Sequence, residues 1–176
     1  MFEFVKDFLR RHSLKKYSSK VESGIIPLSE VHSAIAVIDV EDTSFDQCKN
    51  EMLLFFRKHK IHGEVFFFDF RKLGEGERLI TSINGTVLKK DLNWFGRPSE
   101  EKINLMLQNE PELFISVLDN TDYPIEFMAR VSTAKFKIGR RQLPDNVFDL
   151  VVSDANSARS EAEVFRLIAS FLEKVS

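Results

Sequence analysis

Apolar stretches long enough for one β-strand recur along the chain, and amphipathic stretches separate them. The first, residues 34–38, is continuously apolar and is followed by Asp39 and the polar turn 41–44. Continuous apolarity indicates a strand covered on both faces, which is typical of parallel strands in α/β folds. Further strands are predicted at residues 65–69, 86–88, 113–118, 134–138 and 148–152.

Apolar residues at helical spacing lie between these strands. After the first strand, one helix face is formed by Phe45, Cys48, Met52, Phe55 and Phe56. Similar patterns predict helices that begin near Ser99, Pro124 and Glu161. Strand–helix alternation predicts an α/β fold: a single doubly wound, mainly parallel sheet of five to six strands, with flanking helices and an N-terminal helical arm.

Residues 74–88 admit two interpretations. The dipeptide at 84–85, Asn-Gly, is a hairpin signal because it lies between apolar runs. Residues 77–83 fit a short helix equally well, with Gly85 beyond its end and a strand at 86–88. We favour the helix followed by the strand.

The first 24 residues are expected to form a helical arm and linker, and residues 25–176 the α/β domain. One helix face carries Phe2, Phe4, Val5, Phe8 and Leu9. Basic residues occupy that face beyond Arg11, so we expect a break near Ser13. The first turns are expected to dock on the domain or on a second copy of the chain. Peripheral membrane contact is a less favoured alternative.

The amino-acid composition limits the kinds of protein that this chain can be. The 176 residues are 43% hydrophobic and 30% charged, which is typical of one soluble globular domain. The single cysteine, Cys48, cannot form an internal disulfide, which favours a reducing compartment. No apolar run approaches the roughly 20 residues of a membrane span, and no signal peptide is recognisable. We therefore expect a cytoplasmic protein.

Charge is distributed unevenly along the chain. Residues 1–20 contain six basic and two acidic side chains, a net charge of +4. The rest of the chain contains 19 basic and 25 acidic side chains, a net charge of −6. Because an acidic body repels polyphosphate, no nucleic-acid partner is expected.

Polar residues follow several predicted strands and should meet at the carboxyl edge of the sheet, where ligands bind in such folds. The ligand-binding candidates are Asp39, Asp42, Asp69, Asp119, Asn120 and Arg140, with Asp122, Arg141 and Asp154 nearby. Such carboxylates can hold Mg²⁺, and arginine can clamp a phosphate bidentately. The favoured alternative is that these side chains only cap helices and form turns.

The chain lacks the common catalytic signatures. It contains no Walker loop, complete GxGxxG, HExxH or GxSxG motif, and no Cys/His set for a metal, so no cofactor is assigned. Its single tryptophan, Trp94, is expected to pack in the core, with an exposed aromatic contact for a partner as the alternative.

Three stretches carry a resemblance to a known family: residues 89–98 (KKDLNWFGRP), 134–140 (AKFKIGR) and 148–152 (FDLVV). Together they resemble a bacterial family of α/β proteins of similar length, catalogued only as a domain of unknown function. The resemblance implies a compact α/β protein and supplies no activity or functional residue.

Two hypotheses of function remain, and whether the protein is an enzyme is open. The first is a non-enzymatic protein that binds a protein partner, or forms a homo-oligomer, through its arm, with Phe4, Phe8 and Trp94 as candidate contacts. The second is a binder or enzyme for a phosphorylated metabolite or nucleotide, possibly Mg²⁺-dependent, at the strand ends. We favour the first.

Overall fold

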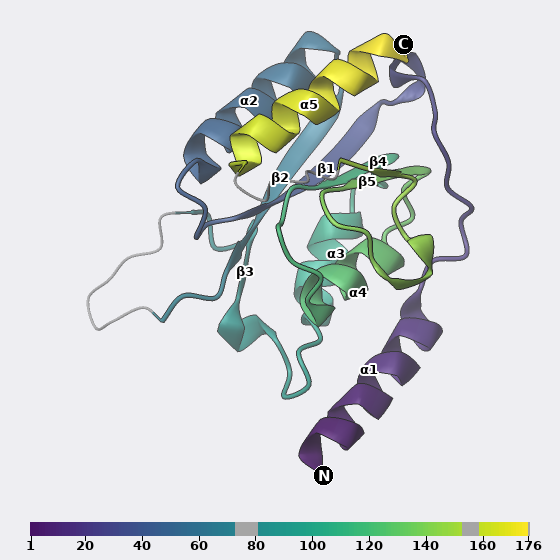
Figure 1. Cartoon of the computed structure of the whole chain (residues 1–176), viewed down its shortest axis with the longest axis vertical. Helices are drawn as coiled ribbons and strands as arrows, with labels where there is room; N and C mark the ends of the chain where they lie inside the picture. Colours follow the sequence, from purple (N-terminus) through teal and green to yellow (C-terminus); the bar gives the residue numbers. More distant parts are fainter. Residues whose placement is uncertain (73–80, 153–158, 176) are drawn as a thin grey trace.

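A central sheet lies between two layers of helices in this computed structural model, which describes residues 1–72, 81–152 and 159–175 (Figure 1). Its strands are β1 (Ser33–Asp39), β2 (His62–Asp69), β3 (Thr86–Leu88), β4 (Leu113–Ser116), β5 (Phe136–Gly139) and β6 (Leu150–Val151). The α-helices are α1 (Phe2–Tyr17), α2 (Phe45–Lys58), α3 (Glu100–Leu107), α4 (Tyr123–Val131) and α5 (Glu161–Lys174).

All described strands pair in parallel, in the order β3-β2-β1-β4-β5-β6. This is the strand order of the Rossmann type of doubly wound sheet, so the predicted fold class is confirmed. The order reverses between β1 and β4. In such sheets the crevice outside the carboxyl ends of the strands at this switch point is the usual ligand site.

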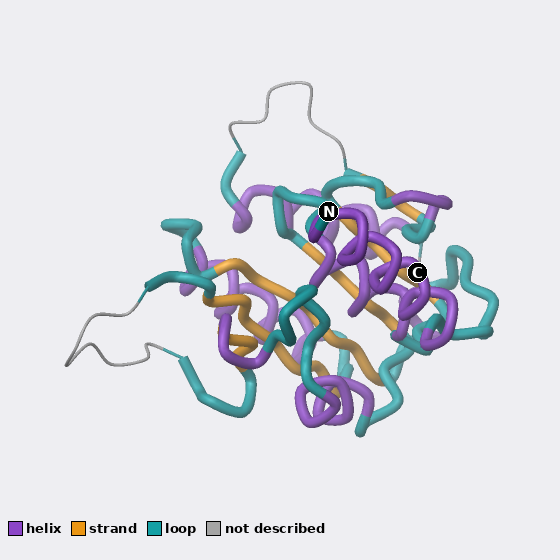
Figure 2. Tube along the Cα trace, turned by 90° about the horizontal axis from the view of Figure 1, so that it is seen from below, coloured by secondary structure: helices purple, strands orange, loops and turns teal. Residues whose placement is uncertain are grey.

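Each face of the sheet has its own apolar core. Alternate residues of β1, such as Ala36 and Ile38, pack beneath α2 and α5 together with Phe56 and Phe165. The residues between them belong to the second core, under α3 and α4. Seen from below, helices lie on either side of the strands (Figure 2). Continuous apolarity along β1 is therefore explained by burial on both faces.

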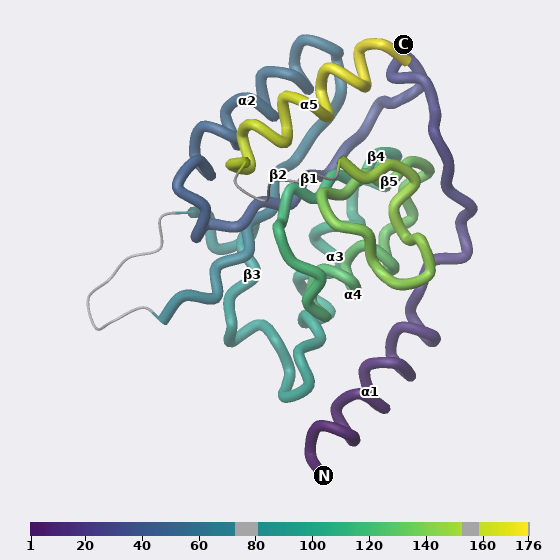
Figure 3. The backbone as a smooth tube through the Cα atoms, viewed as in Figure 1, coloured from purple at the N-terminus to yellow at the C-terminus, as the bar shows by residue number. Residues whose placement is uncertain are grey.

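The arm differs from its prediction. Helix α1 runs unbroken from Phe2 to Tyr17, so the break expected near Ser13 is wrong. Ser13 is buried at 6% exposure, because the second half of α1 docks on α4 through a mixed polar and aromatic stripe rather than an apolar one. The first turns do not dock on the domain. They extend away from it, and the N-terminus is their far end (Figure 3).

The segment between β2 and α3 confirms one predicted element and leaves another largely untested. The strand at 86–88 is confirmed as β3, parallel to β2. Most of the helix expected at 77–83 lies outside the described residues, and residues 81–83 are not helical.

Trp94 is 59% exposed, so its expected core position is wrong. The neighbouring Phe95 instead turns towards Tyr123, with ring centroids 6.4 Å apart.

Candidate functional site

The ligand candidates at the carboxyl edge bind mainly to the protein itself. Asp69, at the end of β2, is 1% exposed and receives a bidentate ion pair from Arg71, with both N–O distances at 2.8 Å. The Arg71 guanidinium holds the pKa of Asp69 below its usual value. Bidentate pairing of this kind leaves little of the carboxylate available to another cation.

Asp39 and Asp42 join the end of β1 to the start of α5. The Asp39 backbone N–H donates to Oε1 of Glu161 at 2.7 Å, and the Glu161 N–H donates to Oδ2 of Asp42 at 3.2 Å. The hydroxyl of Ser44 accepts the next α5 N–H, from Ala162, at 3.2 Å. Free N–H groups at a helix start need such acceptors, so Asp42 and Ser44 serve as caps supplied by another element.

Glu161 is a buried carboxyl group that the sequence did not single out. It is 1% exposed, and its Oε2 has no hydrogen-bond partner within the described part of the chain. Burial raises the pKa of Glu161 to about 9, and the nearby Asp42 and Asp39 carboxylates act in the same direction. The side chain is therefore a neutral acid at pH 7. A glutamate in the first turn of a helix usually faces solvent, so local sequence gave no sign of this burial.

The candidates after β4 and β5 also pair with each other. Arg141 Nε lies 2.6 Å from Asp119 Oδ1, and Arg140 Nη2 lies 3.7 Å from Asp119 Oδ2. Arg140 is 5% exposed and donates to the Arg159 carbonyl oxygen. Asn120 accepts a hydrogen bond from the N–H of Asp122 at 3.1 Å. Asp154 lies outside the described residues.

The loop between β3 and α3 holds the arm in place. Arg10 Nε donates to the Phe95 carbonyl at 2.7 Å, and the Arg97 guanidinium lies 5.1 Å from the ring centroid of Tyr17. The side chain of Asn93 shapes the loop by accepting the N–H groups of residues 95 and 97. Gly96 adopts a φ of +94°, which disfavours a side chain at this position. The family-like stretch 89–98 thus forms a platform under α1.

One end of the molecule exposes a group of apolar side chains. We call it the arm tip, formed by Met1 and by four residues of α1, Phe2, Phe4, Val5 and Phe8. Phe4 is 77% exposed and Phe8 is 62% exposed. Trp94 projects from the platform loop with 59% exposure, and this loop and α1 reach the same lower end of the molecule in Figure 1. All three predicted partner contacts are therefore exposed.

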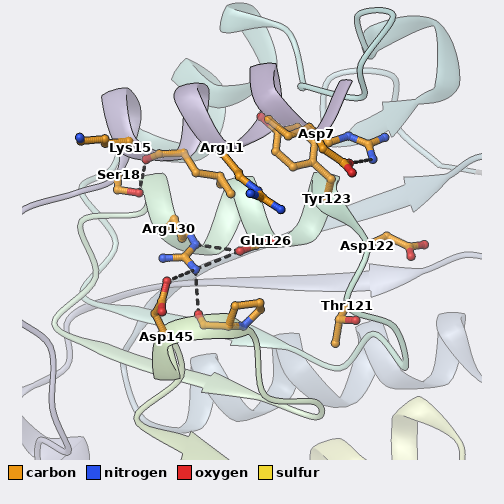
Figure 4. A pocket seen from close by; sticks show the side chains of 13 residues that line it. Asp7, Arg11, Lys15, Ser18, Thr121, Asp122, Tyr123, Glu126, Arg130 and Asp145 are labelled. Atoms are coloured by element: carbon orange, nitrogen blue, oxygen red, sulfur yellow. Dashed lines mark hydrogen bonds and ion pairs between the residues drawn. The ribbon is translucent and has the colours of Figure 1, made fainter. Parts of the chain in front are cut away.

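A cavity of about 840 Å³, lined by several charged side chains, lies between α1 and α4. Figure 4 shows Arg11 reaching into it from α1, opposite Arg130 and Glu126. Arg130 pairs with Glu126 at 3.0 Å and with Asp145 at 3.1 Å. Sequence reasoning missed this cavity, because residues from α1, α4 and the turn at 144–146 meet there only in the folded chain.

A family model for a family of unknown function (DUF6913) matches residues 4–168. The chain belongs to this family. The matched range includes most of α1 and the whole platform loop, so both are part of the family's domain rather than additions to it. Comparisons with curated proteins and with solved structures gave no match.

Two negative findings apply to the described ranges 1–72, 81–152 and 159–175. No helix there is both long and apolar enough to cross a membrane. No group of three or more Asp, Glu, His or Cys side chains there is arranged to hold a metal ion.

Proposed function

We propose that this protein is a docking protein that associates with a second copy of itself through the arm tip and Trp94. The observation that carries the proposal is the exposure of four aromatic side chains at one end of the molecule, between 59% and 80% each. Large exposed apolar groups gathered on a soluble domain mark interaction sites. The Arg10–Phe95 bond fixes α1 to the loop that presents Trp94.

The size of this surface suits a weak homodimer. An aromatic side chain buries roughly 150–250 Å², so the four together supply on the order of 500 Å² per copy. Two copies would bury on the order of 1,000 Å², which is at the low end for a specific interface and predicts reversible association.

Charge also favours a second copy as the occupant. The first 20 residues carry +4 and the remainder −6, so the arm of one copy is attracted to the acidic body of another. This attraction acts when the arm of one copy lies against the body of the other, and it should weaken as salt is added.

Size-exclusion chromatography with light scattering, over a range of protein concentrations, tests the proposal. The wild-type protein should pass from monomer to dimer with increasing concentration, and Phe8→Asp should remain a monomer. Leu54→Asp is the matched control, since Leu54 is an apolar residue on α2 with 59% exposure. A wild-type monomer at every concentration refutes self-association, as does equal loss of dimer in the control. Flotation of that monomer with anionic liposomes would then identify a membrane surface as the occupant.

A second candidate function is the binding of a phosphorylated metabolite or nucleotide at the carboxyl edge. The strand order supports it, because the switch point lies between β1 and β4. Asp39→Asn, Asp119→Asn and Arg140→Ala should each weaken binding in a thermal-shift assay if the ligand contacts these residues. Two further proposals rest on the sequence. They are a cytoplasmic location and the division of the chain into an arm with linker, residues 1–24, and an α/β domain, residues 25–176.

A further inference from the structure

The cavity between α1 and α4 has the dimensions of a small-molecule site. Its volume of about 840 Å³ falls within the roughly 300–1,000 Å³ of ligand pockets. Its walls come from α1, from the loop after β4 with the first turns of α4, and from the turn at 144–145. None of the six ligand candidates predicted from the sequence lines it.

Its charges are not all compensated within the protein. Asp7 lies 3.8 Å from Arg10, and the carboxylates of Glu126 and Asp145 both contact Arg130. Arg11 and Lys15 line the same cavity and form no ion pair within the residues that the structure describes. Two cations on the α1 wall are therefore available to an anion from solution.

The opposite wall begins with the first turn of α4, a nine-residue helix. The side chain of its N-cap residue, Asp122, makes no capping hydrogen bond, and Figure 4 shows this side chain turned away from the other lining residues. Pro124 in this first turn has no N–H, and the Asp122 carboxylate already places a negative charge at the positive end of the helix dipole. A phosphate is therefore expected on the α1 wall, where the two cations lie. The hydroxyl of Thr121 lies next to this turn and also lines the cavity.

Tyr123 closes the part of the cavity that faces α1. Its side chain lines the cavity at 8% exposure. Burial raises the pKa of this phenol, and a side-chain hydrogen bond with Ser13 of α1 acts in the opposite direction. The hydroxyl therefore faces α1, and only the ring is available to a ligand.

We infer that this cavity binds a phosphorylated, hydroxyl-rich metabolite of the sugar phosphate class. The phosphate contacts Arg11 and Lys15 on the α1 wall. The hydroxyl groups of the ligand donate to the carboxylates of Glu126 and Asp145, which retain free lone pairs beyond their bonds to Arg130. The ligand would thereby bridge α1 and α4.

This inference goes beyond both proposed functions, because it assigns a ligand to the α1–α4 cavity and not to the strand ends or the arm tip. Its test is therefore run on the Phe8→Asp variant as well as on the wild-type chain, so that self-association has no influence on the result.

The experiment is calorimetric titration of the full chain with ribose 5-phosphate and with inorganic phosphate, at ionic strength balanced with chloride. Ribose 5-phosphate should bind more tightly than phosphate, because its hydroxyls reach the carboxylates. Replacing Arg11 and Lys15 together by Ala should weaken both ligands at least tenfold, since two charge-assisted contacts are lost. Asp145→Asn should reduce only the advantage of the sugar phosphate.

The matched control replaces Arg57 and Lys60 by Ala, which removes two exposed cations at the end of α2, on the other face of the sheet from α4. It should bind both ligands as the wild type does. Absence of binding by both probes overturns the inference, and so does equal weakening in the control. If Asp39→Asn and Arg140→Ala abolish binding while the Arg11 and Lys15 variant retains it, the ligand lies at the strand ends and the cavity assignment is wrong.

Discussion

Glu161 should make the stability of this protein fall as pH rises, and Glu161→Gln should remove that dependence. The carboxyl group is 1% exposed and its pKa is about 9 in the folded chain, against an ordinary value of 4.5. Glutamine keeps the length of the side chain and an oxygen that accepts the Asp39 N–H. It has no proton to lose.

The sign follows from the proton balance. Between pH 4.5 and about 9 the folded chain holds a proton on Glu161 that the unfolded chain has released, so raising the pH favours unfolding. One proton corresponds to about 1.4 kcal/mol per pH unit. From about pH 5.5 to about pH 7.5 the wild type should lose roughly 3 kcal/mol relative to Glu161→Gln.

Urea unfolding followed by far-ultraviolet circular dichroism measures this difference. Tryptophan fluorescence is a poor probe here, because Trp94 is already 59% exposed in the folded state. The pH range of the measurement ends below the titration of Lys137, since burial lowers the pKa of this lysine to about 8. Lys137 makes stability rise with pH between about 8 and 10.5, where the unfolded chain holds the extra proton. Parallel stability profiles for the wild type and Glu161→Gln would show that Glu161 titrates as an ordinary carboxyl group.

Two further substitutions test the packing and the attachment of the arm. Gly63→Ala places a Cβ only 2.0 Å from the ring of Phe56, so it should cost about 1–3 kcal/mol in urea unfolding. Phe56→Leu should recover part of that loss, and a strictly additive double variant would contradict the steric explanation. Arg97→Ala removes the cation over the Tyr17 ring and should speed tryptic cleavage within α1 several-fold. Unchanged cleavage, with Arg57→Ala as the control, would show that this contact does not hold the arm.

The sheet could be predicted because its signal is local. Residues 34–38 are apolar at every position, and this pattern persists whatever the partner strands are. The strand order was not predictable in the same way, since it depends on which strands pair.

The errors concern residues whose environment is set by distant parts of the chain. Ser13 is buried although it lies in the polar part of α1, because α4 supplies the surface against it. Trp94 is exposed because Asn93 fixes a turn that directs its neighbour Phe95 inward. Asp39 and Asp42 lie at the sheet edge, as expected, but both carboxylates accept hydrogen bonds from the protein. Asp39 accepts the Glu41 N–H, and Asp42 accepts the N–H of Glu161, more than 100 residues later.

The platform loop fixes the position of Trp94 relative to the arm. One short segment both accepts the hydrogen bond from Arg10 and carries Trp94, so the two halves of the apolar surface are held in a fixed relation before any encounter. A second copy that docked there, as proposed, would meet a preorganised shape and would lose little conformational entropy on binding. A rigid surface of modest area can be selective, because it accepts only a surface of complementary shape.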